Sequence, residues 1–198
     1  MRVNLRRLAQ NGFTLIELIA GIVVFAVSLT IVTGLVASQS RQSIDPIWQV
    51  KGIELGQSLL NEINAKAFDE NSDRAGGNDR CNELVTCSVS ANLGVDSGEV
   101  RESFDDVDDF HGLDATGDAI KNSLGETIAG PDGNFYQGFR ARVSVFYDDN
   151  ADGINDDDLN QDGTLDTGVL VGNQKLIRIV ITTPGGDDIS FSSFRTNF

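Results

Sequence analysis

The sequence has few of the residues from which catalytic centres are built. It contains one histidine, His111, and two cysteines, Cys81 and Cys87. A nucleophilic serine or cysteine needs a base beside it, and no GxSxG or Cys/His pattern lies near the histidine. A glycine loop that could cradle phosphates is also missing. We therefore expect a substrate of enzymes rather than an enzyme.

Basic residues are scarce as well. The chain has 15 Lys and Arg against 30 Asp and Glu, and its formal net charge is −15. Nucleic-acid binding needs basic patches that neutralise phosphates, so this composition argues against nucleic acid as a partner. Cys81 and Cys87 are separated by five residues in a polar region. That spacing is poor for zinc, and in an exported protein it favours a small disulfide loop.

One long apolar run stands near the N-terminus. FTLIELIAGIVVFAVSLTIVTGLVA covers residues 13–37. As a helix it spans about 37 Å, enough for a hydrocarbon core of about 30 Å. Arg2, Arg6 and Arg7 precede it, which predicts a cytoplasmic N-terminus and export of the rest of the chain. A secretory signal peptide ranks second, because its apolar region would be only about 7 to 15 residues long.

A plain single-pass anchor explains the length of this run but not the carboxylate of Glu17 inside it. Such a group costs about 2.5 to 3.5 kcal/mol in a membrane. A cut between Gly12 and Phe13 would create an ammonium one helical turn before Glu17, where the free N–H groups also favour a negative charge. Between subunits, Glu17 of one chain could meet the Phe13 amine of a neighbour. The membrane penalty would then favour helix packing in register.

Gly12 followed by FTLIEL resembles the class III signal of type IV prepilins and type II secretion pseudopilins. The resemblance implies that a prepilin peptidase/N-methyltransferase removes the leader 1–12 and methylates Phe13, and that Glu17 guides subunit docking. It further implies that the partners of the protein are the inner membrane, the pilus assembly platform, and major and other minor pilins. We expect a single-pass protein of the bacterial inner membrane with a periplasmic C-terminal domain, which later joins a pilus at the cell surface.

Residues 38–67 are predicted to form an amphipathic periplasmic helix that continues the membrane segment 13–37. Apolar residues near helical spacing form its stripe: Ile44, Trp48, Leu55, Leu59 and Ile63. We expect Trp48 to pack in the core. Pro46 either kinks this helix, or Asp45 caps a second helix whose first position is Pro46.

The globular domain is expected over residues 68–198, with a loop region over 68–138. Within it, FDDVDDF carries four aspartates between Phe104 and Phe110. A cation site is one interpretation, and an acidic loop or short helix held by the two aromatic rings is favoured. We expect His111 to be a structural hydrogen-bonding residue.

Residues 139–198 are predicted to form an antiparallel β-sheet. RARVSVFYD alternates, with Ala141 and Val143 on one face and Arg140 and Arg142 on the other. KLIRIVITT and DDISFSSFRTNF follow, and the PGGD turn between them predicts a hairpin. We expect an α+β fold in which the long N-terminal helix packs on a C-terminal antiparallel sheet. The resemblance implies the same pilin architecture.

Several later segments resemble minor pilins of the mannose-sensitive haemagglutinin (MSHA) pilus. They are DPIWQVKGIELGQSLLNEI, FDENS with a nearby RC, FDDVDDFHGL and SFRTNF. This implies a minor pilin that joins or primes a pilus used in surface attachment. Two alternatives stay open: a type II secretion minor pseudopilin, and a membrane-anchored calcium- or ligand-binding module that never polymerises. The insertion 151–172 has no counterpart in this resemblance.

Residues 148–168, DDNADGINDDDLNQDGTLDTG, contain the pattern DxNxDG twice. Oxygen side chains at alternate positions followed by glycine are typical of calcium loops. Leu159 and Val169 occupy the positions where such loops carry a bidentate glutamate. A solvated turn therefore stays an equal alternative to a calcium site. The candidate ligands are Asp148, Asn150, Asp152, Asp158, Asn160, Asp162 and Asp166.

Overall fold

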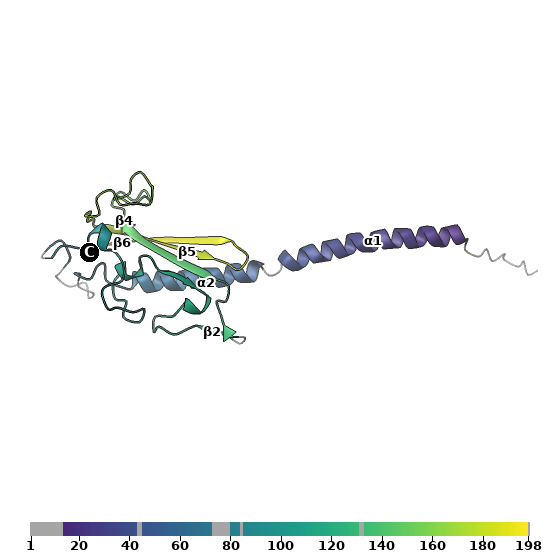
Figure 1. Ribbon diagram of the computed structural model, residues 1–198, viewed down its shortest axis with the longest axis horizontal. Coiled ribbons are helices and arrows are strands. Elements are labelled where there is room, and N and C mark those ends of the chain that lie inside the picture. The colour runs from purple at the N-terminus through teal and green to yellow at the C-terminus, as the bar shows by residue number, and fades with distance from the viewer. Residues whose placement is uncertain (1–13, 43–44, 73–79, 84, 131–132, 198) are drawn as a thin grey trace, which may run out of the picture. The chain divides into compact units, whose positions relative to one another are not determined.

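The computed structural model describes residues 14–42, 45–72, 80–83, 85–130 and 133–197. The chain divides into two compact units, Met1–Asp45 and Pro46–Phe198. The helix α1 (Leu15–Gln42) belongs to the first unit, and the second contains a helix and a β-sheet (Figure 1).

Helix α1 confirms the predicted N-terminal apolar helix. Three of its hydroxyl groups bond within the helix: those of Ser28, Thr30 and Thr33 donate to carbonyls one turn earlier at 2.8 to 2.9 Å. Such internal bonding is what a segment surrounded by hydrocarbon requires, because no water is there to accept these bonds.

A second helix, α2 (Asp45–Asn64), follows. Pro46 is near its start, where the missing N–H costs no helical hydrogen bond. The structure thus has two helices, α1 ending at Gln42 and α2 beginning at Asp45, where the sequence allowed either a kinked rod or two helices. Residues 43–44 lie outside the described part of the chain.

The main sheet of the second unit has four strands in the order β1-β4-β5-β6, and all neighbours are antiparallel. The three long strands are β4 (Arg140–Tyr147), β5 (Gln174–Thr182) and β6 (Asp188–Thr196). The predicted PGGD hairpin joins β5 to β6. Gly186 occupies its positive-φ position, with φ of 92°, and the amide of Thr183 donates to the carbonyl of Asp187.

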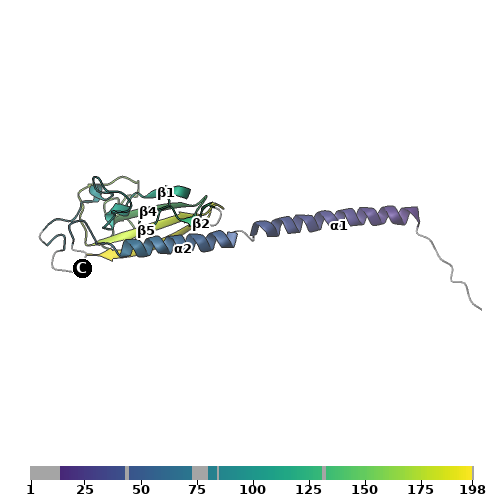
Figure 2. The ribbon, with the colours of Figure 1, turned by 90° about the horizontal axis from the view of Figure 1, so that it is seen from below.

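Helix α2 lies along one face of this sheet (Figure 2). Three of its buried residues are Leu55, Leu59 and Ile63, which are spaced by four and so share one helical face. They pack in one cluster with Ile177, Ile179 and Ile181 of β5, each of which is fully buried. Trp48 packs against this cluster as predicted. The expected α+β architecture, a helix on an antiparallel sheet, is confirmed.

The stretch expected as loop also contributes to the sheet. Its residues Asp114–Thr116 form β1, which pairs with β4 at one edge. A separate two-stranded sheet joins β2 (Ala129–Gly130) to β3 (Gly133–Asn134). These strands are too short to show alternation in the sequence, because a period of two needs several residues to become visible.

Burial along β4 follows the predicted alternation, with one exception. Ala141, Val143 and Val145 are buried on the core face, whereas Phe146 is buried on the opposite face. The guanidinium of Arg178 lies 5.2 Å from the Phe146 ring. Phe146 also lines a cavity together with Leu165 of the loop 148–168. The loop therefore covers this end of the outer sheet face.

Candidate functional site

Glu17 lies in the first turn of α1. Its amide donates to the hydroxyl of Thr14 at 3.3 Å, and the amide of Leu18 donates to the Thr14 carbonyl at 3.1 Å. Thr14 therefore caps the helix, and the Glu17 carboxylate lies near the N–H groups that favour negative charge. The predicted processing residues Gly12 and Phe13 lie outside the described residues.

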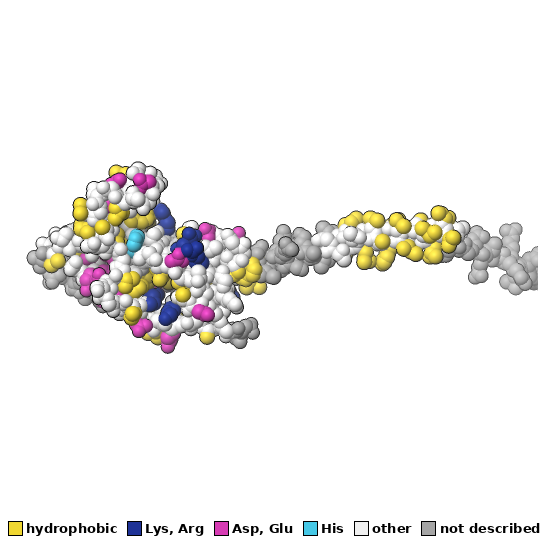
Figure 3. All heavy atoms as spheres, viewed as in Figure 1, with side chains coloured by type: hydrophobic (Ala, Val, Ile, Leu, Met, Phe, Trp, Pro, Cys, Tyr) yellow, Lys and Arg dark blue, Asp and Glu magenta, His cyan; other side chains and the backbone are white. Residues whose placement is uncertain are grey.

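Residues Leu15–Gly34 form a helical segment long and apolar enough to cross a membrane, about 30 Å at the usual rise. All their side chains are exposed in this chain, and apolar groups cover the visible side of the helix (Figure 3). Glu17 is the one charged residue in this segment. A carboxylate at the start of an otherwise apolar span needs a partner or a specific use.

Residues 7–33 match the protein family described as "Prokaryotic N-terminal methylation motif". The chain carries a prepilin-type N-terminus. This supports a type IV pilin- or pseudopilin-like protein that a prepilin peptidase processes and that assembles with other pilins. Neither a curated protein nor a solved structure gives a significant match to the chain.

In the second unit, the acidic segment after Phe104 is held in place by aromatic packing and by its own hydrogen bonds. Phe104 and Phe110 are buried and meet edge to face at 5.2 Å. The segment ends in a 3-10 helix, η2 (Asp108–Phe110), whose last residue is the second of these two aromatics. The carboxylate of Asp106 accepts hydrogen bonds from the amides of Asp108 and Asp109 at 2.7 and 3.1 Å. The structure thus agrees with the favoured interpretation of a short acidic element held by two aromatic rings.

His111 has the structural role predicted for it. Its Nδ1 accepts a hydrogen bond from the amide of Val145 at 3.1 Å. This contact ties the segment after η2 to strand β4.

One buried lysine was not predicted from the sequence. Lys175 on β5 is fully buried, and its Nζ donates to Asp108 Oδ1 at 2.6 Å, to the Phe68 carbonyl at 2.9 Å and to Asp69 Oδ2 at 3.1 Å. The rings of Phe68 and Tyr147 lie 4.3 and 5.3 Å from the same nitrogen. One signal was present: Lys175 is in phase with the core-facing Ile177, Ile179 and Ile181.

The pKa values of the two carboxyl groups beside Lys175 are shifted in opposite directions. Burial raises the pKa of Asp108 to about 8, although the lysine opposes this shift. Burial also disfavours the charged form of Asp69, but Lys175 and the amides of Ser88 and Asn71 together lower its pKa. Burial therefore favours the neutral form of Asp108, whereas the contacts of Asp69 favour its carboxylate.

The predicted disulfide between Cys81 and Cys87 is present, with a Cα–Cα distance of 4.8 Å. Both cysteines are buried. The side-chain amide of Asn197 donates to the Cys81 carbonyl at 2.9 Å, which ties the disulfide loop to the residue that follows β6.

The candidate calcium loop folds as two copies of one turn. In the first copy, the Asp148 carboxylate accepts from the amides of Asp152 and Gly153 at 3.0 and 2.9 Å. In the second, Asp158 accepts from Asp162 and Gly163 at 3.0 and 3.1 Å. The two glycines have nearly equal φ angles, 82° and 84°, in a region that favours glycine.

The other candidate ligands follow the same repeat. Asn150 and Asn160 each accept from the amide two residues later, at 3.0 and 2.9 Å. Asp166 accepts from the amide of Leu159 at 3.1 Å. Side-chain and backbone hydrogen bonds from Thr164 lower the pKa of Asp162, which is therefore charged at neutral pH.

Among the described residues, groups of three acidic or sulfur ligands within 4.8 Å of one another lie outside this loop. One group is Asp69 with Cys81 and Cys87, and the disulfide occupies both of its sulfurs. The other is Glu99 with Asp105 and Asp109. There a hydrogen bond to Asp109 raises the pKa of Glu99 to about 7, as expected for two carboxyl groups that share a proton.

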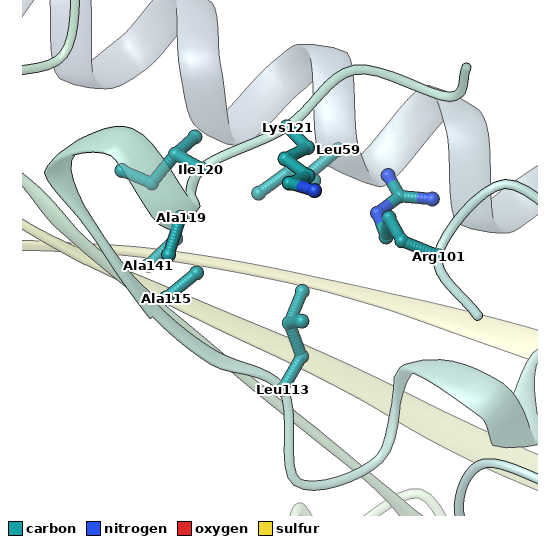
Figure 4. Close-up of a pocket in the computed structure, with 8 residues that line it drawn as sticks. All are labelled: Leu59, Arg101, Leu113, Ala115, Ala119, Ile120, Lys121 and Ala141. Atoms are coloured by element: carbon teal, nitrogen blue, oxygen red, sulfur yellow. The ribbon is translucent and has the colours of Figure 1, made fainter. Parts of the chain in front are cut away.

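A cavity between α2 and the sheet is shown in Figure 4. Its volume is about 20 Å³, and most of its lining is apolar. That is room for one water molecule at most, so the cavity is a packing gap rather than a ligand site. Its lining residues are Leu59, Arg101, Leu113, Ala115, Ala119, Ile120, Lys121 and Ala141.

Proposed function

We propose that this protein is a minor type IV pilin that joins or primes a pilus used in surface attachment. One observation carries the proposal: the methylation motif of residues 7–33 coincides with a membrane-length apolar helix whose one charge, Glu17, lies in its first turn. An anchor alone has no need of that carboxylate. A docking helix does, because Glu17 can pair with the new amine of a neighbouring subunit.

The proposed location is the inner membrane, with the N-terminus in the cytoplasm and the second unit in the periplasm. Arg2, Arg6 and Arg7 precede the apolar span, which favours this orientation. The Cys81–Cys87 disulfide is consistent with an oxidising compartment on the far side. Assembly would then carry the protein to the cell surface.

Within this class we propose a subunit similar to MshD, a minor pilin of the MSHA pilus. Three of the segments that support this similarity lie in α2, η2 and β6. DPIWQVKGIELGQSLLNEI is nearly all of α2, FDDVDDFHGL contains η2, and SFRTNF covers the end of β6. A type II secretion minor pseudopilin would share the N-terminal features, so its exclusion needs a cellular experiment.

Mass spectrometry of the mature N-terminus tests the proposal. We expect a chain that begins with methylated Phe13, and a Gly12→Val variant that keeps its leader. Gly21→Ala, a substitution within the span where nothing lies within 4 Å, is the control and should be processed normally. Assembled material that still contains residues 1–12 would refute the proposal. Loss of protein secretion rather than of pili in a deletion strain would favour the pseudopilin.

A further inference from the structure

Lys175 brings together three segments that are distant in the sequence. Asp69 follows α2, Asp108 lies in η2, and Lys175 is the second residue of β5. The amine and both carboxyl groups are buried, with side-chain exposures of 0% for Lys175 and Asp69 and 4% for Asp108. Water is therefore excluded from the contact.

The surroundings favour neutral over charged groups. Phe68 and Tyr147 flank the amine, and burial raises the pKa of the Asp108 carboxyl group, which favours its neutral form. Within the described residues, Asp108 Oδ2 is buried without a hydrogen-bond partner. An ordinary buried ion pair would instead be expected to satisfy both oxygens of its carboxylate.

An amine, a neutral carboxylic acid and a carboxylate base, held together in a dry site, are the reactants of an amide condensation. The fold holds the amine against the acid, which converts a slow bimolecular reaction into an intramolecular one. Because the site excludes water, the reverse hydrolysis lacks a reactant once the product water has left.

We propose that Lys175 and Asp108 become joined by an isopeptide bond between Nζ of the lysine and Cγ of the aspartate, with Asp69 as the proton acceptor. The bond is a covalent cross-link between strand β5 and the acidic element after Phe104. It forms after folding, because only the folded chain brings these residues together.

The reaction balances with these three residues alone. The Lys175 ammonium gives one proton to Asp69, and the freed lone pair of Nζ forms a bond to Cγ of Asp108. The bond from Cγ to the hydroxyl oxygen breaks, and this hydroxyl leaves with a second proton from Nζ as one water molecule. The products are a neutral amide, water and protonated Asp69, and no oxidant or external reagent is needed.

Peptide mass spectrometry of the full-length protein tests the proposal and does not depend on N-terminal processing. After reduction and trypsin digestion, we expect peptide 102–121 joined to peptide 143–178, lighter than their sum by one water. Cleavage after Lys175 should be absent in the joined species, whereas cleavage after the exposed Lys121 is the internal control. Separate, unmodified peptides with cleavage after Lys175 would overturn the proposal and leave a plain ion pair.

Two variants separate the roles of the residues. Lys175→Arg keeps the positive charge but lacks the amine, so we expect no joined peptide, whereas Lys66→Arg should retain it. Asp69→Asn keeps the shape of the side chain but cannot accept the proton, so the joined fraction should fall and accumulate more slowly. An unchanged joined fraction in Asp69→Asn would refute the proton-acceptor role. The wild-type digest decides the existence of the bond even if a variant fails to fold.

Discussion

The ring of Phe191 in β6 occupies the space that a side chain at Gly56 in α2 would need. A Cβ added at Gly56 would lie 2.1 Å from Cε2 of that ring and within 2.8 Å of two further ring atoms. Glycine is unfavourable within a helix. Here it allows the helix to approach the sheet closely.

We predict that Gly56→Ala destabilises the second unit. The gain in helix propensity is about 1 kcal/mol, whereas overpacking a core contact costs about 1 to 3 kcal/mol. Because the clash is with a half-buried ring that packs against the core, we expect the cost to prevail and the free energy of unfolding to fall by about 1 kcal/mol. Thermal or denaturant unfolding of the full-length protein in detergent measures this.

Gly52→Ala is the matched control, since its nearest atom is the flexible end of Ile189 at 2.9 Å. It should cost less than Gly56→Ala. The double variant Gly56→Ala with Phe191→Leu should recover part of the loss, because the smaller side chain makes room. A Gly56→Ala protein as stable as the wild type would show that β6 shifts freely.

The second prediction concerns the disulfide. Replacing both Cys81 and Cys87 with serine should lower the free energy of unfolding by about 2 kcal/mol, the loop-closure contribution of so short a loop. Both residues are buried and the loop contacts Asn197, so the loss should include packing. Unfolding of wild type and variant without reductant gives the difference. Equal stabilities would mean that the loop is held by its other contacts.

The third prediction is a pH dependence at Glu99. Its hydrogen bond to Asp109 raises its pKa in the folded protein to about 7 from 4.5, with burial and the nearby Asp96 and Glu70 acting in the same direction. The protonated form is thus favoured by folding. Its stabilising contribution is complete below pH 4.5 and is lost as the pH rises through about 7.

Glu99→Gln should remove this dependence, because an amide keeps a hydrogen-bond donor at every pH. We expect the variant to gain stability relative to the wild type as the pH rises from 5 to 8, measured as the difference between their unfolding midpoints. The control Glu126→Gln changes an exposed glutamate in another loop. A constant difference between Glu99→Gln and wild type across this range would refute the shared proton.

The sequence predicted those parts of the fold whose signals are local. The alternation in β4, the hairpin turn at Gly186 and the apolar stripe through Leu55 and Leu59 each depend on neighbouring residues, and the structure contains all three. Strand β1 was not predicted, because its three residues form a strand only by pairing with β4.

The Lys175 cluster could not be predicted for a different reason. Lysine and aspartate are usually exposed, so each of Asp69, Asp108 and Lys175 suggested a solvated surface. They become partners only when α2, η2 and β5 meet, and no local pattern encodes that meeting. The phase of Lys175 along β5 indicated that it faces the core, but not what it would contact there.

The fourth prediction is calcium binding by the loop 148–168. In the second turn, Asn160 and Asp162 are exposed and Asp158 is half-buried. We expect binding at about 10⁻³ M or tighter, as in extracellular calcium modules. Calorimetric titration of the metal-free full-length protein measures this affinity. Asp162→Asn keeps the one oxygen that accepts hydrogen bonds from Thr164 but removes one charge, so binding should weaken.

Asp118→Asn, an exposed aspartate outside the loop, is the control for that experiment and should titrate like the wild type. Magnesium should compete poorly, because it retains its waters and uses few protein ligands. If no heat of binding is detected up to millimolar calcium, the loop is a solvated Asp/Asn/Gly turn.

The last prediction concerns Glu17 and joins the N-terminal geometry to the proposed function. Glu17→Ala removes the one charge of the span, so membrane insertion should be intact or improved. In a fibre, the Phe13 amine of the adjacent subunit would lose its partner, and an unpaired charge in the membrane costs about 2.5 to 3.5 kcal/mol. We therefore expect incorporation into pili to fall by more than about tenfold, measured by immunoblots of sheared pili against membrane fractions. Ser28→Ala is the matched control, since that hydroxyl bonds only to the Val24 carbonyl of its own helix, and it should leave both fractions unchanged. Wild-type amounts of the Glu17→Ala protein in sheared pili would mean that the carboxylate does not guide docking.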